Sequence, residues 1–290
     1  MRMTKEIKRI TLLLMLLISA TMVYAQPQLH YLDIQVVLSK NGDARISELR
    51  NMTIDGKGSE CYIGMDNISP STVKDLIVSD ESGRLYENIG SWDKKRAKLD
   101  KAGRCGIVKK DNGGLEICWG VDSSGKHTYV TSYTITGLVR GYADADAICH
   151  KFLDKSYKPK PEWARVTIVS ADTTLSFTPD TCGVWGFNFK GDTYYVKGAL
   201  VAMTTEAMKD DAALCVMAKF PKGMLEPTIQ ITDDTFEHKK QLAVEGRDDA
   251  FTEEKKSAGV LLTILKVLGF LAVFAIVLGG LYYLFKKLKK

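Results

Sequence analysis

Histidine is scarce in this chain, and the residue spacings that usually bind zinc are missing. Only four histidines occur among 290 residues, and there is no Cys-x-x-Cys or His-x-x-x-His pair, which disfavours a structural zinc site. Gly-x-Ser-x-Gly, His-Glu-x-x-His and phosphate-cradling glycine loops are also missing. Adjacent Cys149 and His150 point in different directions on a helix or a strand, so they do not readily form a nucleophile–base pair. We therefore predict no enzymatic activity, no catalytic residue, no metal and no cofactor.

An excess of one charge sign is absent from the middle of the chain. Residues 1–25 hold four basic residues and residues 266–290 hold five, against one acidic residue, so 31 basic and 34 acidic residues remain between them. The formal net charge of +5 therefore comes from the two ends. No basic surface is predicted for the middle region, and we expect no nucleic-acid partner.

Long apolar runs are confined to the same two ends. Residues 1–25 are predicted to be a cleavable signal peptide. A basic start is followed by the apolar run Ile10 to Met22, and then by Val23-Tyr24-Ala25, which fits the small-x-small cleavage rule. The alternative is an uncleaved anchor helix. The apolar run has 13 residues, which is short of the roughly 20 that span a bilayer.

The second apolar run predicts a single transmembrane helix within residues 259–285, since residues 267–285 carry no charge. A buried core helix is the alternative. The basic tail at 286–290 favours a cytoplasmic C-terminus, which leaves the long preceding region outside the bacterial cytoplasmic (inner) membrane, on its periplasmic side. The expected membrane-anchor residues are Lys266, Tyr282, Tyr283, Lys286 and Lys287.

Two positions are possible for Lys266. We favour a position at the outer interface of the bilayer, where its aliphatic stem extends along the lipid and Val267 is the first residue of the span. If the helix instead begins near Ala258, the charge of Lys266 lies inside the apolar zone and marks a partner helix.

The region between the ends shows strand patterning. Leu32, Ile34, Val36 and Leu38 are apolar at every second position, the turn Lys40 to Asp43 contains Asn-Gly, and a return strand follows over 44–54. Short strands with turn signals are predicted at 72–79, 84–89, 105–109, 115–121, 128–139, 164–170, 175–177, 184–189, 194–202 and 213–220. We predict a mainly β fold, an antiparallel β-sandwich ectodomain over 26–231 with a single C-terminal transmembrane α-helix.

We also make predictions for three segments outside the predicted strands. Ala143 to Leu153 is predicted as one short helix. The Lys158 to Pro161 segment, with two prolines, is the best internal boundary; we favour one continuous sandwich over two small domains. Residues 232–258 are charged and lose the apolar alternation, which predicts a stalk in front of the membrane.

Six cysteines lie in the middle region, where an oxidising compartment would permit disulfides. If Lys110 to Gly113 form a four-residue loop, Cys105 lies directly opposite Cys118; a two-residue loop instead places Ile107 opposite Cys118. We predict a Cys105–Cys118 disulfide, whose closed loop would stabilise the fold by about 3 kcal/mol.

Two further features of the sequence can be interpreted in structural or in functional terms. Glu48 and Arg50 break the apolar alternation of their strand, which predicts a charge pair that protects a sheet edge. The tryptophans, Trp92, Trp119, Trp163 and Trp185, are predicted to fill the core; a binding platform would need several of them exposed on one face.

The order of these features resembles a known family. Gly42 is followed by Ala44-Arg45-Ile46-Ser47-Glu48, a "dG-x-x-x-V-x-E" element; Tyr129, Tyr133, Ile135 and Gly137 form a "Y-x-I-x-Y-x-V-x-G" element; Trp163 and the segment 219–223 follow. Over about 29–225 this is similar to the domain of unknown function 2207 family of predicted bacterial membrane proteins. The resemblance implies an exported β domain tethered at the cytoplasmic membrane, with no established catalytic residues. Many relatives continue beyond the first helix, so this chain lacks that part or is a truncated form.

Three hypotheses follow for function. The favoured one is a binding or scaffold module of the cell envelope, with the lipid bilayer and an envelope protein as partners, because edge strands accept added strands. The alternatives are an envelope enzyme acting on glycan or peptidoglycan, and a subunit of a membrane complex.

Overall fold

The computed structural model of the chain describes residues 26–66, 68–111 and 113–252. Strands dominate this part of the chain, which confirms the prediction of a mainly β fold. The strands are β1 Gln28–Leu38, β2 Ala44–Ile54, β3 Glu60–Met65, β4 Val73–Ser79, β5 Glu87–Ser91, β6 Arg104–Lys109, β7 Leu115–Gly120, β8 Gly125–Ile135, β9 Arg140–Tyr142, β10 Asp146–Leu153, β11 Pro161–Ser170, β12 Gly183–Phe187, β13 Gly191–Val196, β14 Ala199–Thr204, β15 Leu214–Phe220 and β16 Ile229–Ile231. The helices are α2 Lys98–Lys101, α3 Phe236–Val244 and the 3-10 helix η1 Asp248–Phe251.

The largest sheet has seven strands in the order β13-β14-β11-β1-β2-β8-β4. Its centre is the predicted hairpin, in which β1 and β2 pair antiparallel from Leu38↔Ala44 outward. The connecting turn is closed by the Gly42 N–H, which donates to Ser39 O at 3.0 Å. Gly42 has φ +84°, a value that favours glycine.

Two smaller sheets complete the fold, a five-stranded one in the order β12-β15-β10-β9-β16 and a four-stranded one in the order β3-β7-β6-β5. The predicted antiparallel pairing is corrected to mixed sheets. β1 pairs parallel with β11, β5 with β6 and β16 with β9. Pairing between strands so distant in sequence is set by the tertiary fold, and local alternation does not report it.

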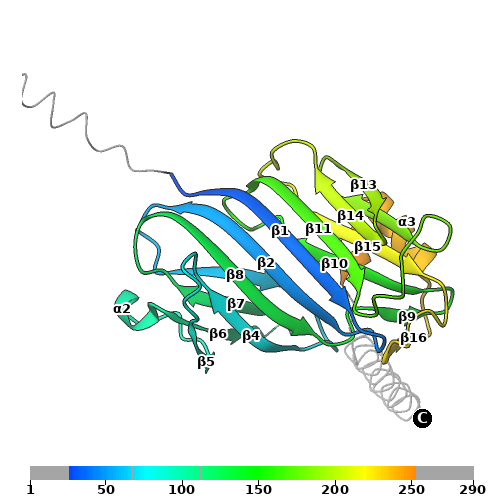
Figure 1. The fold of residues 1–290 in the computed structure, drawn as a ribbon, viewed down its shortest axis with the longest axis horizontal. Coiled ribbons are helices and arrows are strands. Elements are labelled where there is room, and N and C mark those ends of the chain that lie inside the picture. Colours follow the sequence, from blue (N-terminus) through cyan, green and yellow to red (C-terminus); the bar gives the residue numbers. More distant parts are fainter. Residues whose placement is uncertain (1–25, 67, 112, 253–290) are drawn as a thin grey trace, which may run out of the picture. The chain divides into compact units, whose positions relative to one another are not determined.

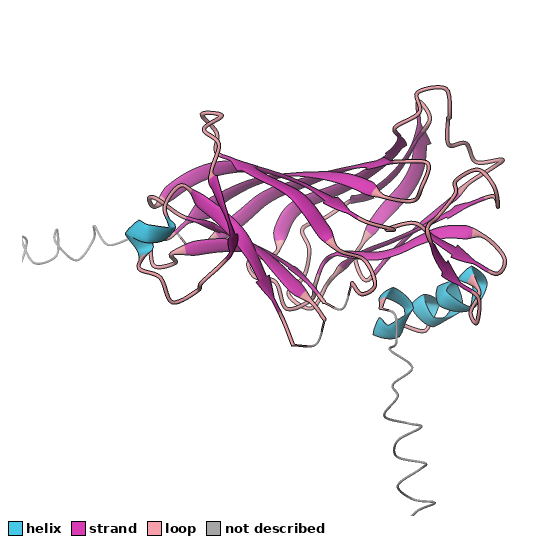
Figure 2. Ribbon diagram, turned by 90° about the horizontal axis from the view of Figure 1, so that it is seen from below, coloured by secondary structure: helices cyan, strands magenta, loops and turns pink. Residues whose placement is uncertain are grey.

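Both smaller sheets pack on one face of the large sheet, which Figure 2 shows curving above them. The alternating residues Leu32, Ile34, Val36 and Leu38 are fully buried on that face. A single apolar cluster joins them to Ile117 of the four-stranded sheet and to Ile148, Val216 and Phe220 of the five-stranded sheet. The opposite face of the large sheet, toward the viewer in Figure 1, is left uncovered by these sheets.

Two predicted segments differ in the structure. The helix expected at Ala143 to Leu153 is instead strand β10, which pairs with β15 and β9. Both faces of β10 are covered by other parts of the protein. Its sequence therefore lacks the apolar–polar alternation that marks a half-buried strand. The strand expected at 194–202 is a hairpin of β13 and β14 that turns at Lys197 and Gly198.

The predicted stalk at 232–258 is corrected for its first part. Helix α3 begins at an N-cap, Thr235, whose side chain accepts a hydrogen bond from the His238 N–H. Phe236 and Leu242 of this helix, with Phe251 of η1, are buried in a second apolar cluster on the outer face of the five-stranded sheet. Because polar residues lie between these buried residues, the sequence shows no apolar pattern that predicts this buried face.

Within the described residues no helix is both long and apolar enough to cross a membrane. The predicted signal peptide (1–25) and transmembrane helix (259–285) lie outside those residues. The same holds for the predicted anchor residues Lys266, Tyr282, Tyr283, Lys286 and Lys287.

Candidate functional site

Aromatic side chains gather on the uncovered face of the large sheet. The parallel register of β1 and β11 places Tyr31 beside Trp163. Their ring centroids are 6.5 Å apart in an edge-to-face arrangement. Because neighbouring Leu32 and Ala164 point into the core, both rings point outward. Tyr31 remains 37% exposed.

A charged pair lies next to these rings on the same face. Arg165 stands opposite Asp33 in the register, and its Nε donates to Asp33 Oδ1 at 3.0 Å while Nη2 contacts Oδ2. The hydrogen bond to Asp33 raises the pKa of Arg165 above its usual value. The guanidinium also stacks over Trp163, 5.2 Å from the ring centroid. These contacts orient the Arg165 guanidinium over the Trp163 ring.

The same surface continues toward the edge strand. Met203 of β14 lies opposite Arg165, and its sulfur is 4.0 Å from the Tyr194 hydroxyl of β13. Tyr194 is 37% exposed. We call the six residues of this surface the outer-face cluster: Tyr31, Asp33, Trp163, Arg165, Tyr194 and Met203.

Strand β13 offers a free edge beside the outer-face cluster. Thr205 N donates to Lys190 O, and the antiparallel register then directs the backbone N–H and C=O groups of Gly191, Thr193 and Tyr195 away from β14. Among the residues described, these outward groups have no backbone partner.

The opposite edge, formed by β4, is already occupied. Tyr86 N donates to Val78 O at 2.9 Å, and the Asn88 side chain donates to Leu76 O at 3.0 Å. β13 is therefore the edge of the large sheet that is better placed to accept an added strand.

A second polar site lies inside the protein. Glu48 and Arg50 pair as the sequence predicted, but β2 lies between β1 and β8 and is not a sheet edge, which corrects their assignment to edge protection. Arg50 Nε and Nη2 donate to the same oxygen, Glu48 Oε2, at 3.0 and 2.6 Å. Each side chain is only 1% exposed. The two charges therefore balance each other in the core.

Two tyrosines complete this buried group. The Tyr133 hydroxyl donates to Glu48 Oε1 at 2.5 Å, and the Tyr157 ring lies 5.1 Å from the Arg50 guanidinium. Burial and the neighbouring Glu48 charge raise the pKa of Tyr133 well above its usual value. Burial works against the charge of Arg50, but Glu48 outweighs it and raises the pKa of Arg50. Arg50 thus stays a cation and Tyr133 a neutral donor.

A cavity of about 80 Å³ adjoins Arg50 where the three sheets meet. Its wall includes Tyr62 and Gly64 of β3, Phe152 of β10 and Tyr157. Arg50 Nη1, the guanidinium nitrogen that Glu48 does not hold, has no hydrogen-bond partner in the described part of the chain. Tyr62 and Tyr157 also contact each other, with ring centroids 5.4 Å apart.

The charged groups in the cavity wall are already paired. Lys110 lies 3.3 Å from both Asp66 and Glu116. Asp154 accepts from Lys151 at 3.1 Å. Burial raises the pKa of Asp154, but hydrogen bonds from Ser156 and the Lys151 charge outweigh it and lower the pKa to about 2. The Asp154 carboxylate therefore stays ionised.

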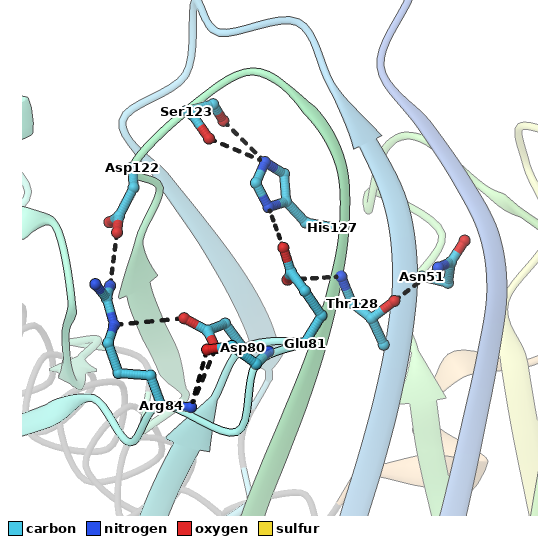
Figure 3. A network of polar contacts seen from close by, with 9 residues as sticks. Asn51, Asp80, Glu81, Arg84, Asp122, Ser123, His127 and Thr128 are labelled. Atoms are coloured by element: carbon cyan, nitrogen blue, oxygen red, sulfur yellow. Dashed lines mark hydrogen bonds and ion pairs between the residues drawn. The ribbon is translucent and has the colours of Figure 1, made fainter.

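One surface network contains the residue types of a catalytic triad (Figure 3). His127 lies between Ser123 and Glu81, with Nδ1 3.4 Å from Glu81 Oε1. His127 Nε2, however, is closer to the Ser123 backbone oxygen (3.1 Å) than to the hydroxyl oxygen (3.5 Å). Glu81 Oε2 also accepts from Thr128 N, and Thr128 Oγ1 accepts from Asn51. The ring thus ties a loop to the sheet, and its Nε2 is not aimed at the hydroxyl as a general base would be.

The predicted Cys105–Cys118 disulfide is contradicted by the strand register. Cys105 pairs with Trp119, and Gly106 pairs with Cys118. Because a one-residue offset reverses the face, the two side chains point to opposite sides of the sheet. Both thiols are free and buried, and burial raises their pKa values to about 11 and 12 respectively. Neither predicted loop occurs, because the strands close at Lys109↔Leu115.

Cys149 and His150 occupy successive positions of β10, so they project to opposite faces of that strand. The centroids of the His150 and Phe152 rings are 4.7 Å apart. Burial, with Arg140 and Lys151 nearby, lowers the pKa of His150 to about 4. The geometry agrees with the prediction that the two adjacent residues do not act together.

The outer-face cluster is not among the sites predicted from the sequence. Trp163 is predicted in the core, but it is half-buried on the outer face, and Trp185 is also only half-buried. Trp92 and Trp119 are buried as predicted. The signal was present in the alternation, because Tyr31 and Trp163 each precede a fully buried residue. The β1–β11 pairing that joins them was not readable from the sequence.

A family model described as "Predicted membrane protein (DUF2207) N-terminal domain" matches residues 29–199. No curated protein matches the chain.

Several solved structures share a distant likeness. A putative protease from Parabacteroides distasonis has 14% identity and a TM-score of 0.36, with 67% of this chain and 40% of that chain covered. Yeast LTA4 hydrolase in complex with bestatin has 10% identity and a TM-score of 0.40, with 69% and 29% covered. An M1 zinc metallopeptidase from Deinococcus radiodurans has 8% identity and a TM-score of 0.31, with 66% and 42% covered. This chain spans less than half of each, and such low scores carry no argument about its activity.

Proposed function

Because the chain belongs to the DUF2207 family of predicted membrane proteins, we propose that it is a membrane-anchored binding module that recognises a protein partner in the bacterial cell envelope. In this proposal residues 1–25 are a cleaved signal peptide and residues 259–285 a single transmembrane helix. The basic residues after that helix keep the C-terminus in the cytoplasm. The β domain then faces the extracytoplasmic side.

The outer-face cluster is the observation that carries the proposal. Tryptophan, tyrosine and arginine are the residue types that dominate binding energy at protein interfaces. Here Tyr31, Trp163, Arg165 and Tyr194 share one sheet face, and the Asp33 contact orients Arg165. An arginine that is already oriented loses less side-chain freedom when a partner binds.

The free edge of β13 indicates what kind of partner segment would bind. Its outward backbone groups at Gly191, Thr193 and Tyr195 can form hydrogen bonds with the backbone of an extended chain. A segment added there would extend the large sheet, and its side chains on the outer face would lie beside Tyr194. We therefore expect the partner to present an extended protein segment and an apolar or aromatic side chain.

Affinity capture of the full-length, membrane-embedded protein tests the proposal. Trp163→Ala and Tyr31→Ala should each reduce recovery of the captured partner at least about tenfold, since hot-spot truncations cost about 2 kcal/mol or more. Ile77→Ala is the matched control, because Ile77 is 45% exposed on β4 at the far side of the same sheet. Its recovery should equal that of the wild type.

A second pair of variants tests the edge. Thr193→Pro removes an outward N–H without removing a hydrogen bond to β14, while Thr193→Val keeps that N–H. Recovery should fall for the proline variant only. Equal recovery from wild type, Trp163→Ala and Thr193→Pro would overturn the proposal.

A further inference from the structure

We propose that two copies of this chain pair with each other through strand β13, antiparallel, with a twofold axis at Tyr194. The pairing joins the two seven-stranded sheets edge to edge and closes the free edge of each. A second copy then occupies the edge that is offered to the envelope partner, so the two exclude each other. This competition rests on the proposed function, whereas the pairing of the two copies does not.

The first argument is that β13 is an unprotected edge strand. Proteins protect such edges with proline, with lysine, with a bulge that twists the strand away, or with a covering segment. The segment Gly191–Val196 contains neither proline nor lysine. Its pairing with β14 runs without a register shift, whereas β4 at the opposite edge has one between Lys74 and Ile77. A regular edge of this kind is a template for another strand.

The second argument is the direction of the backbone groups. Those of Gly191, Thr193 and Tyr195 point away from β14. Two antiparallel strands exchange hydrogen bonds only where outward-pointing residues face each other. An axis at Tyr194 meets this condition, because Thr193 of each copy then faces Tyr195 of the other, and each such pair exchanges both of its N–H···O bonds.

The third argument is the charge pattern, which selects the register. An axis at Asp192 sets two carboxylates directly opposite each other, which destabilises paired strands. An axis at Thr193 leaves those carboxylates on a diagonal, about 7–8 Å apart. An axis at Tyr194 pairs two aromatic rings on the outer face and separates the two Asp192 residues by about 13 Å, at about 3.3 Å per residue. Beyond Tyr194 the axis approaches the turn at Lys197, which has φ +48°.

The inner side of β13 is held in place, which leaves its edge open. Thr193 Oγ1 donates to Val184 O of β12 at 3.3 Å. The Tyr195 hydroxyl donates to Cys182 O at 2.8 Å. On the outer face Val196 is 44% exposed. The strand is therefore ordered before a second copy arrives, which lowers the entropic cost of pairing.

Disulfide trapping in the full-length, membrane-embedded protein tests the pairing. One strand edge is a small interface, and contacts below about 1,200 Å² are typical of weak complexes, so a covalent trap is the suitable measurement. Across the axis, the two Tyr194 Cα atoms would be about 4.5 Å apart. That separation lies within the range of about 4.4–6.8 Å that a disulfide bridges.

The trap uses a Cys149→Ser background, because the other native cysteines are buried. Under mild oxidation Tyr194→Cys should form a covalent dimer. Asp192→Cys is the matched control, since Asp192 is also exposed on the outer face of β13 but lies too far from its copy to bond. Adding Thr193→Pro to Tyr194→Cys should abolish the dimer, and adding Thr193→Val should preserve it, because only proline removes the outward N–H.

The trapped Tyr194→Cys dimer also tests the competition. Its recovery of the envelope partner should be lost, and reduction of the disulfide should restore it. Equal recovery before and after reduction would overturn the competition between partner and second copy.

The remaining outcomes decide the pairing. A covalent dimer from Tyr194→Cys that is absent from Asp192→Cys and lost with Thr193→Pro supports it. No dimer from Tyr194→Cys, or equal amounts from Tyr194→Cys and Asp192→Cys, overturns it. In that case the proposed function still stands if Trp163→Ala reduces partner capture, so the two failures are distinguishable.

Discussion

Arg50 Nη2 lies 2.6 Å from Glu48 Oε2, and both residues belong to a central strand of the seven-stranded sheet. Residues two apart in a strand share one face, so this pair sits on the buried face that two smaller sheets cover. The pair shapes the polar interior of the protein, and its energetics can be measured directly.

Removing one partner of the pair should be far more costly than removing both. Arg50→Met leaves Glu48 buried without its cation, and we expect the free energy of unfolding to fall by about 3–5 kcal/mol. The double variant Glu48→Gln/Arg50→Met should lose less than Arg50→Met alone. Urea unfolding followed by tryptophan fluorescence measures this, because all four tryptophans lie in the β domain. A double variant that loses the sum of the two single losses would contradict the pairing.

Tyr133→Phe should destabilise the fold by about 1.5–3 kcal/mol, because its hydroxyl donates to a buried carboxylate. Tyr195→Phe is the control, since that hydroxyl donates to a neutral backbone oxygen, Cys182 O, at 2.8 Å; we expect about 0.5–1.5 kcal/mol there. The same urea titration compares them. Equal losses would show that the Glu48 contact is not charge-assisted.

His150 should make the β domain sensitive to acid. Its pKa is lowered from 6.5 to about 4 in the fold, so between those values the unfolded chain binds a proton that the folded chain does not. Stability is therefore intact above pH 6.5 and falls as the pH drops toward 4, by up to about 2 kcal/mol between pH 7 and pH 5. His150→Gln should lose less stability than wild type over that interval. Parallel pH profiles of the two proteins would contradict the assignment.

Two glycines separate backbone strain from steric conflict. Gly42 and Gly83 have nearly equal φ values, +84° and +81°, but a Cβ at Gly42 would lie 2.8 Å from Val139 O while Gly83 has nothing within 4 Å. Gly83→Ala should cost about 1–2 kcal/mol from the left-handed conformation alone. Gly42→Ala should cost at least about 1 kcal/mol more. Urea midpoints of the two variants give the comparison, and equal shifts would contradict the close packing at the first turn.

The sequence predicted the local parts of this fold well. The β1–β2 hairpin was readable because Leu32 to Leu38 alternate and an Asn-Gly turn follows. Strand β10 was missed because both of its faces are covered, which removes the alternation. The packing of α3 was missed because its buried residues are few, with Lys239 among them.

The candidate site was less predictable than the fold. The break in alternation at Glu48 and Arg50 marked a charge pair, but only the strand order shows that the pair is interior. Tyr31 and Trp163 come together through a parallel pairing between strands far apart in the chain. The proposed Cys105–Cys118 disulfide failed because a single position of register reverses the face of a side chain.

Thiol labelling of intact cells tests the central claim, that the β domain lies outside the cytoplasmic membrane. Leu99 is 88% exposed, whereas the native cysteines are buried apart from the half-buried Cys149. In a Cys149→Ser background, Leu99→Cys should react with a membrane-impermeant maleimide in intact spheroplasts, and Lys290→Cys only after the membrane is opened. Labelling of Lys290→Cys but not Leu99→Cys in intact spheroplasts would contradict the account.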